Sequence, residues 1–93
     1  TAEVERIVPE HPDVLEAAVV GLPDKRWGEM VTAMVVPRQG AAIDGADLEA
    51  FCRERLAGFK VPRRVEVVSE LPRNPMGKVQ KFRIVEELSG GKQ

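Results

Sequence analysis

The sequence predicts a small α+β domain in which helices pack on a short three-stranded sheet. Two Val-rich apolar runs bounded by Gly and Pro predict neighbouring buried strands, and an alternating segment after an amphipathic helix predicts a third. The resulting order is helix, strand, strand, helix, strand, helix, which is typical of this class. With 93 residues the chain can form one domain with a modest core, but it is short for a complete enzyme acting on two substrates.

The first half of the chain contains one helix and two strands. The opening stretch AEVERIVPEHP carries apolar residues at helical spacing and is ended by prolines, so we expect a short amphipathic helix. VLEAAVVGLPD is predicted to be a buried strand stopped by Gly21 and Pro23, and MVTAMVVP a second strand stopped by Pro37. The polar segment LPDKRWGE, residues 22–29, is the turn between them.

The second half is predicted to add two helices and a strand. DGADLEAFCRERLAGF has apolar residues at steps of three and four, with Asp44 or Asp47 available as a cap, so a helix is expected over residues 44–59. RRVEVVSELP alternates like a strand, KFRIVEEL resembles a closing helix, and SGGKQ is expected to be a frayed tail. Residues 70–80 form a long loop containing Pro72, Pro75 and Gly77.

Charge is distributed unevenly along the chain. Residues 1–59 contain six Lys or Arg against eleven Asp or Glu, whereas residues 60–83 contain seven against two. This basic segment suggests an anionic partner, such as a phosphate ligand or a nucleic acid, although an ordinary solvated face explains it equally well. Aromatic residues make up only 4% of the chain and none lies between Lys60 and Lys81, which argues against stacking on bases.

Several residues are expected to have structural roles. Cys52, the only cysteine, lies on the apolar stripe of the helix over residues 44–59 and is predicted to be a core side chain. A single cysteine fits a reducing cytoplasm, and we see neither a secretory leader nor an apolar run of the roughly 20 residues that a membrane span needs. His11 is expected to be a surface turn residue, and no acidic cluster has metal-ligand spacing.

The loop ELPRNPMGK raises the question of what Lys78 does. A Gly-Lys pair suggests a Walker phosphate loop, but that motif needs a glycine at position 72 and a Ser or Thr at position 79. Pro72 and Val79 stand there, so a Walker loop is excluded.

Taken together, these segments resemble the C-terminal domain of the acyl-adenylate-forming (AMP-binding) enzymes. The resemblance covers nearly the whole chain and depends on AEVE, HPDVLEAAVVGLPDKRWGEMVTAMVVP and LEAFCRERLAGFKVPRRVEVVSELPRNPMGK, in that order. The RWGE and FKVPR details are most similar to aryl- and acyl-CoA ligases, particularly 4-chlorobenzoate CoA ligase. The resemblance implies a mobile lid domain spanning residues 1–93, with a large N-terminal domain and hinge absent.

By this resemblance Lys78 is the catalytic lysine for joining a carboxylic acid to ATP. Gly77 would give the backbone room to approach the nucleotide. A compact ammonium on a long stem is suited to stabilising two anions that must approach each other. The resemblance also makes Lys78 a candidate for regulatory acetylation.

The second face of the domain is implied to contact coenzyme A. Trp27 would stack on the adenine with Phe59 nearby, and Arg63 would meet a phosphate. Chlorobenzoate ligase has an arginine where Val61 stands here, so one phosphate contact would be missing or supplied by Lys60 or Arg64.

The resemblance finally implies that ATP and CoA are substrates and that Mg²⁺ is a cofactor, with the magnesium contacts in the absent N-terminal domain. The 93-residue chain is expected to be inactive alone, as an excised or proteolysed lid. Two alternatives remain at this point: a free-standing, non-catalytic interaction domain derived from the lid, and a basic nucleic-acid-binding module. The identity of the acid, the choice between CoA and a carrier protein as acceptor, and the oligomeric state are left open.

Overall fold

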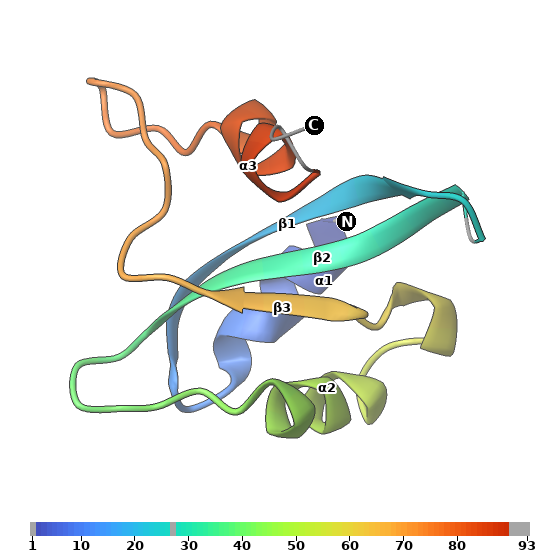
Figure 1. Ribbon diagram of the computed structural model, residues 1–93. Coiled ribbons are helices and arrows are strands. Elements are labelled where there is room, and N and C mark those ends of the chain that lie inside the picture. Colours follow the sequence, from blue (N-terminus) through green and yellow to red (C-terminus); the bar gives the residue numbers. More distant parts are fainter. Residues whose placement is uncertain (1, 27, 90–93) are drawn as a thin grey trace.

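A single three-stranded sheet forms the centre of the molecule. The computed structural model describes residues 2–26 and 28–89 (Figure 1). Strand β1 (Val14–Asp24) pairs antiparallel with β2 (Gly28–Pro37), and β2 pairs in parallel with β3 (Arg64–Val67), giving the order β1-β2-β3. The predicted α+β class with three strands is confirmed.

Helices cover both faces of this sheet. Helix α1 (Ala2–Ile7), followed by the 3-10 turn η1 (Val8–Glu10), and helix α2 (Gly45–Arg53) lie on one face. Helix α3 (Lys81–Leu88) covers the other face, so the domain has three layers (Figure 1). The predicted closing helix over residues 81–88 is confirmed.

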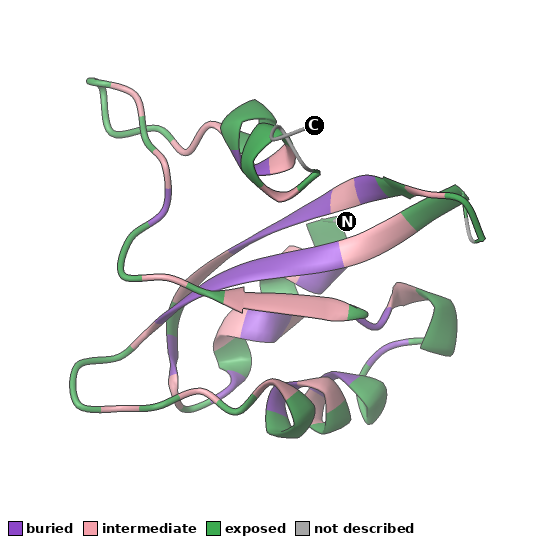
Figure 2. Cartoon of the chain, viewed as in Figure 1, coloured by how far each residue is buried: buried purple, intermediate pink, exposed green. Residues whose placement is uncertain are grey.

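The two-sided cover explains why β1 and β2 are nearly continuously apolar instead of alternating. Successive strand residues point to opposite faces, so Ala33 and Val35 join the cluster beneath α1 and α2, whereas Met34 and Val36 join the cluster beneath α3. Both sets are buried, as the colouring of β2 in Figure 2 shows. Strands buried on both faces need apolar residues at every position.

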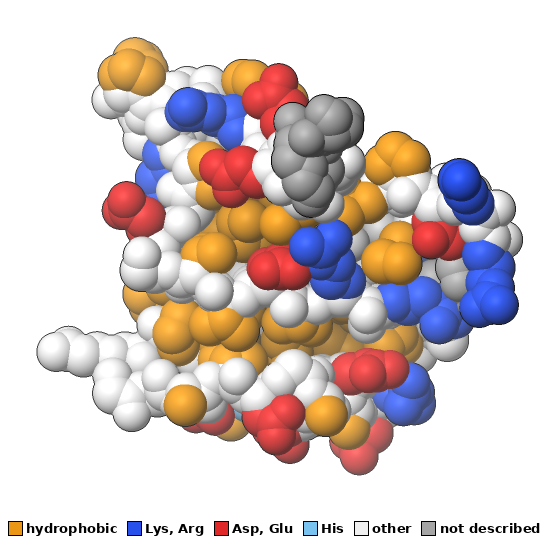
Figure 3. All heavy atoms as spheres, viewed as in Figure 1, with side chains coloured by type: hydrophobic (Ala, Val, Ile, Leu, Met, Phe, Trp, Pro, Cys, Tyr) orange, Lys and Arg blue, Asp and Glu red, His pale blue; other side chains and the backbone are white. Residues whose placement is uncertain are grey.

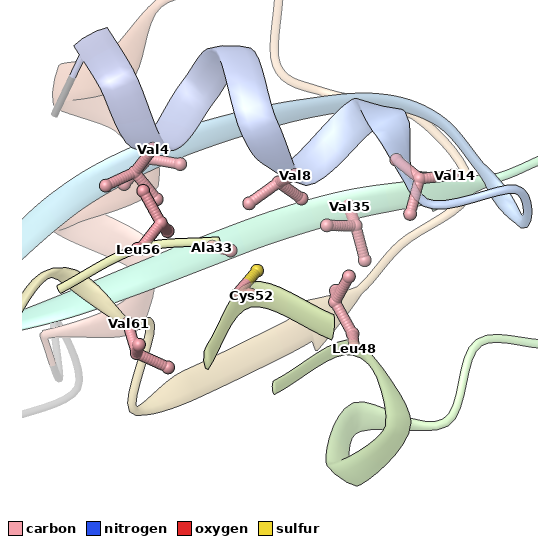
Figure 4. Packing of buried hydrophobic residues seen from close by; sticks show 10 residues of the cluster. Val4, Val8, Val14, Ala33, Val35, Leu48, Cys52, Leu56 and Val61 are labelled. Carbon is pink, nitrogen blue, oxygen red and sulfur yellow. The ribbon is translucent and has the colours of Figure 1, made fainter. Parts of the chain in front are cut away.

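The larger cluster lies between the sheet and the first two helices. In Figure 4 side chains from α1, η1, β2 and α2 converge there, and the sulfur of Cys52 lies among them. Cys52 is 0% exposed, which confirms its predicted place in the core. Burial raises the pKa of its thiol, so the group stays protonated near neutral pH.

The first strand is longer than predicted. Gly21 and Pro23 were expected to stop it, but β1 continues to Asp24, with Pro23 opposite Glu29. Proline is tolerated because β1 is an edge strand, where a missing N–H breaks no ladder bond. The polar turn therefore shrinks from residues 22–29 to the short connection between Asp24 and Gly28.

The second helix is shorter than predicted. It starts as expected, because the Asp44 side chain accepts a hydrogen bond of 2.9 Å from the backbone N–H of Ala46. It ends at Arg53 instead of continuing to Phe59, and the chain then enters the 3-10 turn η2 (Gly58–Lys60). Leu56 still reaches the core, whereas Phe59 is 78% exposed.

His11 is not the surface residue that the sequence suggested. It is only 5% exposed, and its Nε2 lies 2.9 Å from an Asp47 carboxylate oxygen on α2. Its Nδ1 accepts a hydrogen bond from the backbone N–H of Asp13, and its ring packs edge-on against Phe51. The side chain thus connects the segment before β1 to α2.

Candidate functional site

The loop that carries Lys78 is a closed hairpin rather than an open coil. It leaves the core at Leu71, which is buried, and returns at Gln80, whose N–H donates to the Pro72 carbonyl over 2.9 Å. Arg73 and Val79 form an antiparallel bridge above this closure. In Figure 1 the loop projects beyond the sheet, in orange at the upper left.

Asn74 organises the turn inside this hairpin. Its side-chain oxygen accepts hydrogen bonds from the backbone N–H of Met76 and of Lys78, at 2.9 and 3.0 Å. Its own N–H donates to the Lys78 carbonyl, and its carbonyl accepts from the N–H of Gly77. Both backbone polar groups of Lys78 are therefore held by one residue.

Gly77 is required here by its conformation. Its φ of +86° lies in the left-handed region, where residues with a side chain are strained. A Cβ at this position would meet nothing within 4 Å, so within this chain the glycine provides the turn and not space. The expectation that it lets a nucleotide approach remains a prediction.

Lys78 is exposed, and its ammonium has no hydrogen bond or ion pair within residues 2–26 and 28–89. Most cations around it in sequence are paired. Lys60 bonds Glu3 at 2.5 Å and Lys81 bonds Glu5 at 2.5 Å, while Arg64 and Arg73 contact Glu66 and Glu16 respectively. At least four of the seven cations of the basic segment thus have a carboxylate partner, whereas in the described residues the ammonium of Lys78 remains available to a ligand.

The Glu5–Lys81 pair fixes the start of α3 against α1. Glu5 also accepts a hydrogen bond of 2.9 Å from the backbone N–H of Val19 on the edge strand β1. Burial alone would raise the pKa of Glu5, but the bonds from Lys81 and Val19 outweigh it and hold that pKa below its usual value.

A second candidate region lies at the other end of the molecule, beside η2 and the β1–β2 turn (Figure 1). Phe59 and Arg63 line a depression of about 280 Å³ there, together with Glu29, Val31 and Val61. The structure therefore brings Phe59 and Arg63 to one depression, and their expected contacts with CoA remain a prediction. Trp27, the expected adenine-stacking residue, lies outside the described residues.

Because Gly21 has no side chain, Glu29 can lie above it and form part of the lining of this depression. A Cβ at Gly21 would lie 2.1 Å from the Glu29 carboxylate, so the Glu29 side chain occupies the space above that glycine. Gly21 and Glu29 come from paired strands, two positions apart in the register.

Replacement of an arginine by Val61 has a clear structural consequence. Val61 is 4% exposed and packs in the core, so it borders the depression without offering a charged group to a ligand. The expected substitutes are engaged elsewhere: Lys60 with Glu3, and Arg64 with Glu66 and the Leu88 carbonyl.

A third depression, of about 460 Å³, lies between α3 and the base of the Lys78 loop. It is lined in part by Leu71, Pro72, Arg73 and Arg83, and by none of the predicted site residues. Among residues 2–26 and 28–89 no three His, Cys, Asp or Glu side chains gather as a metal-binding cluster. No helix in that same part has the length and apolar character to cross a membrane.

Acidic and basic side chains lie on different parts of the surface. Figure 3 shows mostly acidic side chains along the lower edge, where α2 lies, and Lys and Arg side chains gathered towards the end that bears the β1–β2 turn. This end also holds the depression beside Phe59.

Sequence reasoning missed Arg73, Asn74 and Glu29. Asn74 could have been found, because Asn before Pro is a strong signal for a turn in which the side chain bonds the backbone. Arg73 could not, because its carboxylate partner Glu16 is 57 positions away in sequence.

Comparisons with known proteins agree with the geometry. The AMP-binding enzyme C-terminal domain family matches residues 3–78. A 4-chlorobenzoate–CoA ligase from Arthrobacter sp. is 54% identical over 86 residues, covering 92% of this chain and 16% of that protein. Among solved structures, ATP-bound MatB from Rhodopseudomonas palustris superposes with a TM-score of 0.92 at 41% identity, covering 99% of this chain and 18% of the other.

A second solved structure with this fold comes from an amide bond synthetase. The amide bond synthetase McbA from Marinactinospora thermotolerans superposes with a TM-score of 0.87 at 45% identity, covering 92% of this chain and 17% of its own. The present chain thus spans less than a fifth of the length of the proteins it matches. With its fold, its loop and its sequence in agreement, the chain belongs to the AMP-binding enzyme C-terminal domain family.

Proposed function

We propose that this chain is the mobile C-terminal domain of an ATP-dependent acyl-CoA ligase and that Lys78 is its catalytic lysine for adenylation. The observation that carries the proposal is the unpaired, exposed ammonium of Lys78 on a closed, hydrogen-bonded loop. A large N-terminal domain of the same protein would supply the acid, ATP and magnesium sites. The 93-residue chain alone would then form no acyl-CoA.

In the first half-reaction a carboxylate oxygen forms a bond to the α-phosphorus of ATP. The bond from that phosphorus to the bridging oxygen breaks, and pyrophosphate leaves. Both reactants are anions, so a cation that reaches both lowers their repulsion and stabilises the charge of the transition state. The long, flexible stem of Lys78 suits this task, and the exposed loop leaves its ammonium accessible.

In the second half-reaction the thiolate of CoA attacks the acyl carbon, and AMP leaves as the bond from that carbon to its oxygen breaks. We assign contacts with the CoA nucleotide to Phe59 and Arg63, with Trp27 as a further candidate. The shared depression of Phe59 and Arg63 supports this assignment, since it offers an aromatic face and a guanidinium together. The two regions lie at opposite ends of the domain, which fits a domain that turns between half-reactions.

The alternative of a nucleic-acid-binding module is disfavoured by the ion pairs. At least four of the seven cations in residues 60–83 bond a carboxylate of this chain, so much of this positive charge is already paired and less attractive to a phosphate backbone. A non-catalytic lid is disfavoured because the Asn74 side chain makes two hydrogen bonds that hold the backbone of the Lys78 turn. A domain without chemistry would not need Lys78 held in this way.

The test uses the full-length protein that contains this domain, with pyrophosphate release measured when CoA is omitted. We expect Lys78→Ala to lower the rate by about a hundredfold or more, as removal of a charge-stabilising group does, and to spare thioester formation from a supplied acyl-adenylate. Arg38→Ala, which removes an exposed loop cation away from both regions, is the matched control and keeps the rate. Equal losses in both half-reactions would contradict the assignment of Lys78 to adenylation.

A further inference from the structure

We propose that Arg73 and Asn74 are positioning residues, whose side chains build the Lys78 hairpin and fix it to the sheet before any substrate binds. This inference rests on the proposed function of Lys78 and adds two residues that do not themselves touch the reacting atoms. It follows from the network of hydrogen bonds around the loop. Its experiments are chosen to separate failure of this inference from failure of the proposed function.

The tip of the loop has little apolar support, although Val79 at its base packs against the cluster beneath α3. Between buried Leu71 and the start of α3, Met76 is 89% exposed, and Gly77 and Lys78 are exposed as well. An exposed segment without packed side chains is expected to open easily unless hydrogen bonds hold it. The order of the exposed tip must therefore come mainly from polar contacts.

Asn74 supplies the contacts inside the loop. One side-chain oxygen accepts hydrogen bonds from two backbone N–H groups, those of Met76 and Lys78, and so holds the tip of the hairpin closed. Together with the bond from the Asn74 N–H to the Lys78 carbonyl, this fixes the backbone of Lys78 on both sides. No other side chain in the described parts of the chain bonds the backbone of Lys78.

Arg73 supplies the contact between the loop and the sheet. One nitrogen of its guanidinium donates to the Gly77 carbonyl at 2.8 Å, next to Lys78, and the other nitrogen bonds the Glu16 carboxylate on β1. The planar guanidinium can hold two acceptors at once in fixed directions, which a lysine could not do. The tip of the loop is thus tied to the rigid strand pair.

This arrangement leaves one part of Lys78 free and fixes the rest. Its side chain remains exposed and unpaired, while its backbone has a defined position relative to the sheet. When the domain closes on a substrate, the ammonium then starts from a restricted volume, which lowers the entropy lost in reaching the transition state. A misplacement of about 1 Å can cost a hundredfold in rate, so loss of either anchor should be visible in catalysis.

The first test measures hydrogen exchange of the full-length protein without substrate, in the peptide covering residues 73–80. We expect Asn74→Ala to speed exchange of the Met76 and Lys78 amides at least tenfold, because both lose their acceptor. Asn74→Asp keeps an oxygen at the same place, so its exchange should match the wild type. Unchanged exchange in Asn74→Ala would overturn the inference whatever the catalytic data show.

The second test measures pyrophosphate release with CoA omitted, using whichever of benzoate, butyrate and palmitate is turned over fastest. We expect Asn74→Ala and Arg73→Ala to lower kcat by about 10- to 100-fold and to leave the KM for ATP within about twofold, since the interaction lost is one made in the transition state. Transfer from a supplied acyl-adenylate to CoA should be unaffected. Arg38→Ala is the control for the loss of an exposed arginine.

The outcomes separate the two levels of the argument. If Lys78→Ala abolishes adenylation while Asn74→Ala and Arg73→Ala keep it within about twofold, the positioning roles are wrong and the proposed function stands. If Lys78→Ala itself keeps the rate, the proposed function fails. Faster exchange together with a selective loss of adenylation in both anchor variants supports the inference.

Discussion

Replacement of Ile84 by alanine tests whether α3 is an integral part of the fold. Ile84 is the buried residue of this helix, at 0% exposure, and it packs with residues of β1 and β2 in the cluster on the second face of the sheet. The Lys78 loop leads directly into α3. A detached α3 would therefore free the loop at its downstream end.

The magnitude follows from the atoms removed. Ile84→Ala deletes three carbon atoms, worth about 0.8 kcal/mol each in transfer free energy, or about 2.4 kcal/mol. A residual cavity adds to this and the better helix propensity of alanine subtracts a few tenths, so we expect a loss of about 2–4 kcal/mol in the free energy of unfolding. Each 1 kcal/mol lowers the Tm of a domain of this size by about 4–8 °C, which makes the loss easy to measure.

The assay is urea unfolding of the 93-residue chain followed by circular dichroism, with Phe82→Ala as the matched control. Phe82 lies two positions away on the same helix but is 61% exposed, so its replacement should change stability by about 0.5 kcal/mol or less. A loss below about 1 kcal/mol for Ile84→Ala, with faster exchange confined to α3, would refute the reasoning. It would mean that α3 opens independently of the sheet.

Four further predictions concern other parts of the chain. Cys52, buried and with a raised thiol pKa, should not react with a thiol reagent near neutral pH until the chain unfolds, and rapid labelling of the folded protein would contradict its placement. Because the pKa of Glu5 is lowered in the folded state, its stabilising contribution is present above the ordinary value of 4.5 and is lost as pH falls through the lowered value, so Glu5→Gln should flatten the fall in stability below pH 4.5, and parallel pH curves would refute this. Asp44→Ala removes the cap of α2 and should cost about 1 kcal/mol in urea unfolding, whereas a neutral result would mean that the cap bond contributes nothing. Arg63→Ala should raise the KM for CoA of the full-length protein by about tenfold, the loss expected for a hydrogen bond between charged groups, and an unchanged KM would remove Arg63 from the CoA surface.

Local signals in the sequence were sufficient for most elements of the fold. The Val-rich runs, the cap at Asp44 and the apolar spacing in residues 81–88 each act within a few positions, and the structure confirms the corresponding strands and helices. The end of β1 was predicted wrongly, because Pro23 is acceptable only on an edge strand and the strand order is a property of the whole sheet. The burial of His11 depends on Asp47, 36 positions away, so it could not be predicted from the neighbouring sequence either.

The candidate site likewise combines features that follow from neighbouring residues with features that depend on residues far away in sequence. The motif around Lys78 pointed to the loop and its family, and the proximity of Phe59 to Arg63 followed from their short separation in sequence. The partners of the charged residues did not follow, because Lys60 and Arg73 each bond a glutamate 57 positions away. These pairs determine which cations remain available to a ligand, so they decide more about the site than net charge does.

The glycine at position 21 has a consequence for variation within this domain. Because the Glu29 carboxylate lies where a side chain at position 21 would begin, these two positions share one volume. Any larger residue at position 21 displaces that carboxylate, and Glu29 borders the depression that also contains Phe59 and Arg63. Substitutions at the two positions should therefore be correlated among related domains, and a library that alters the depression should vary them as a pair.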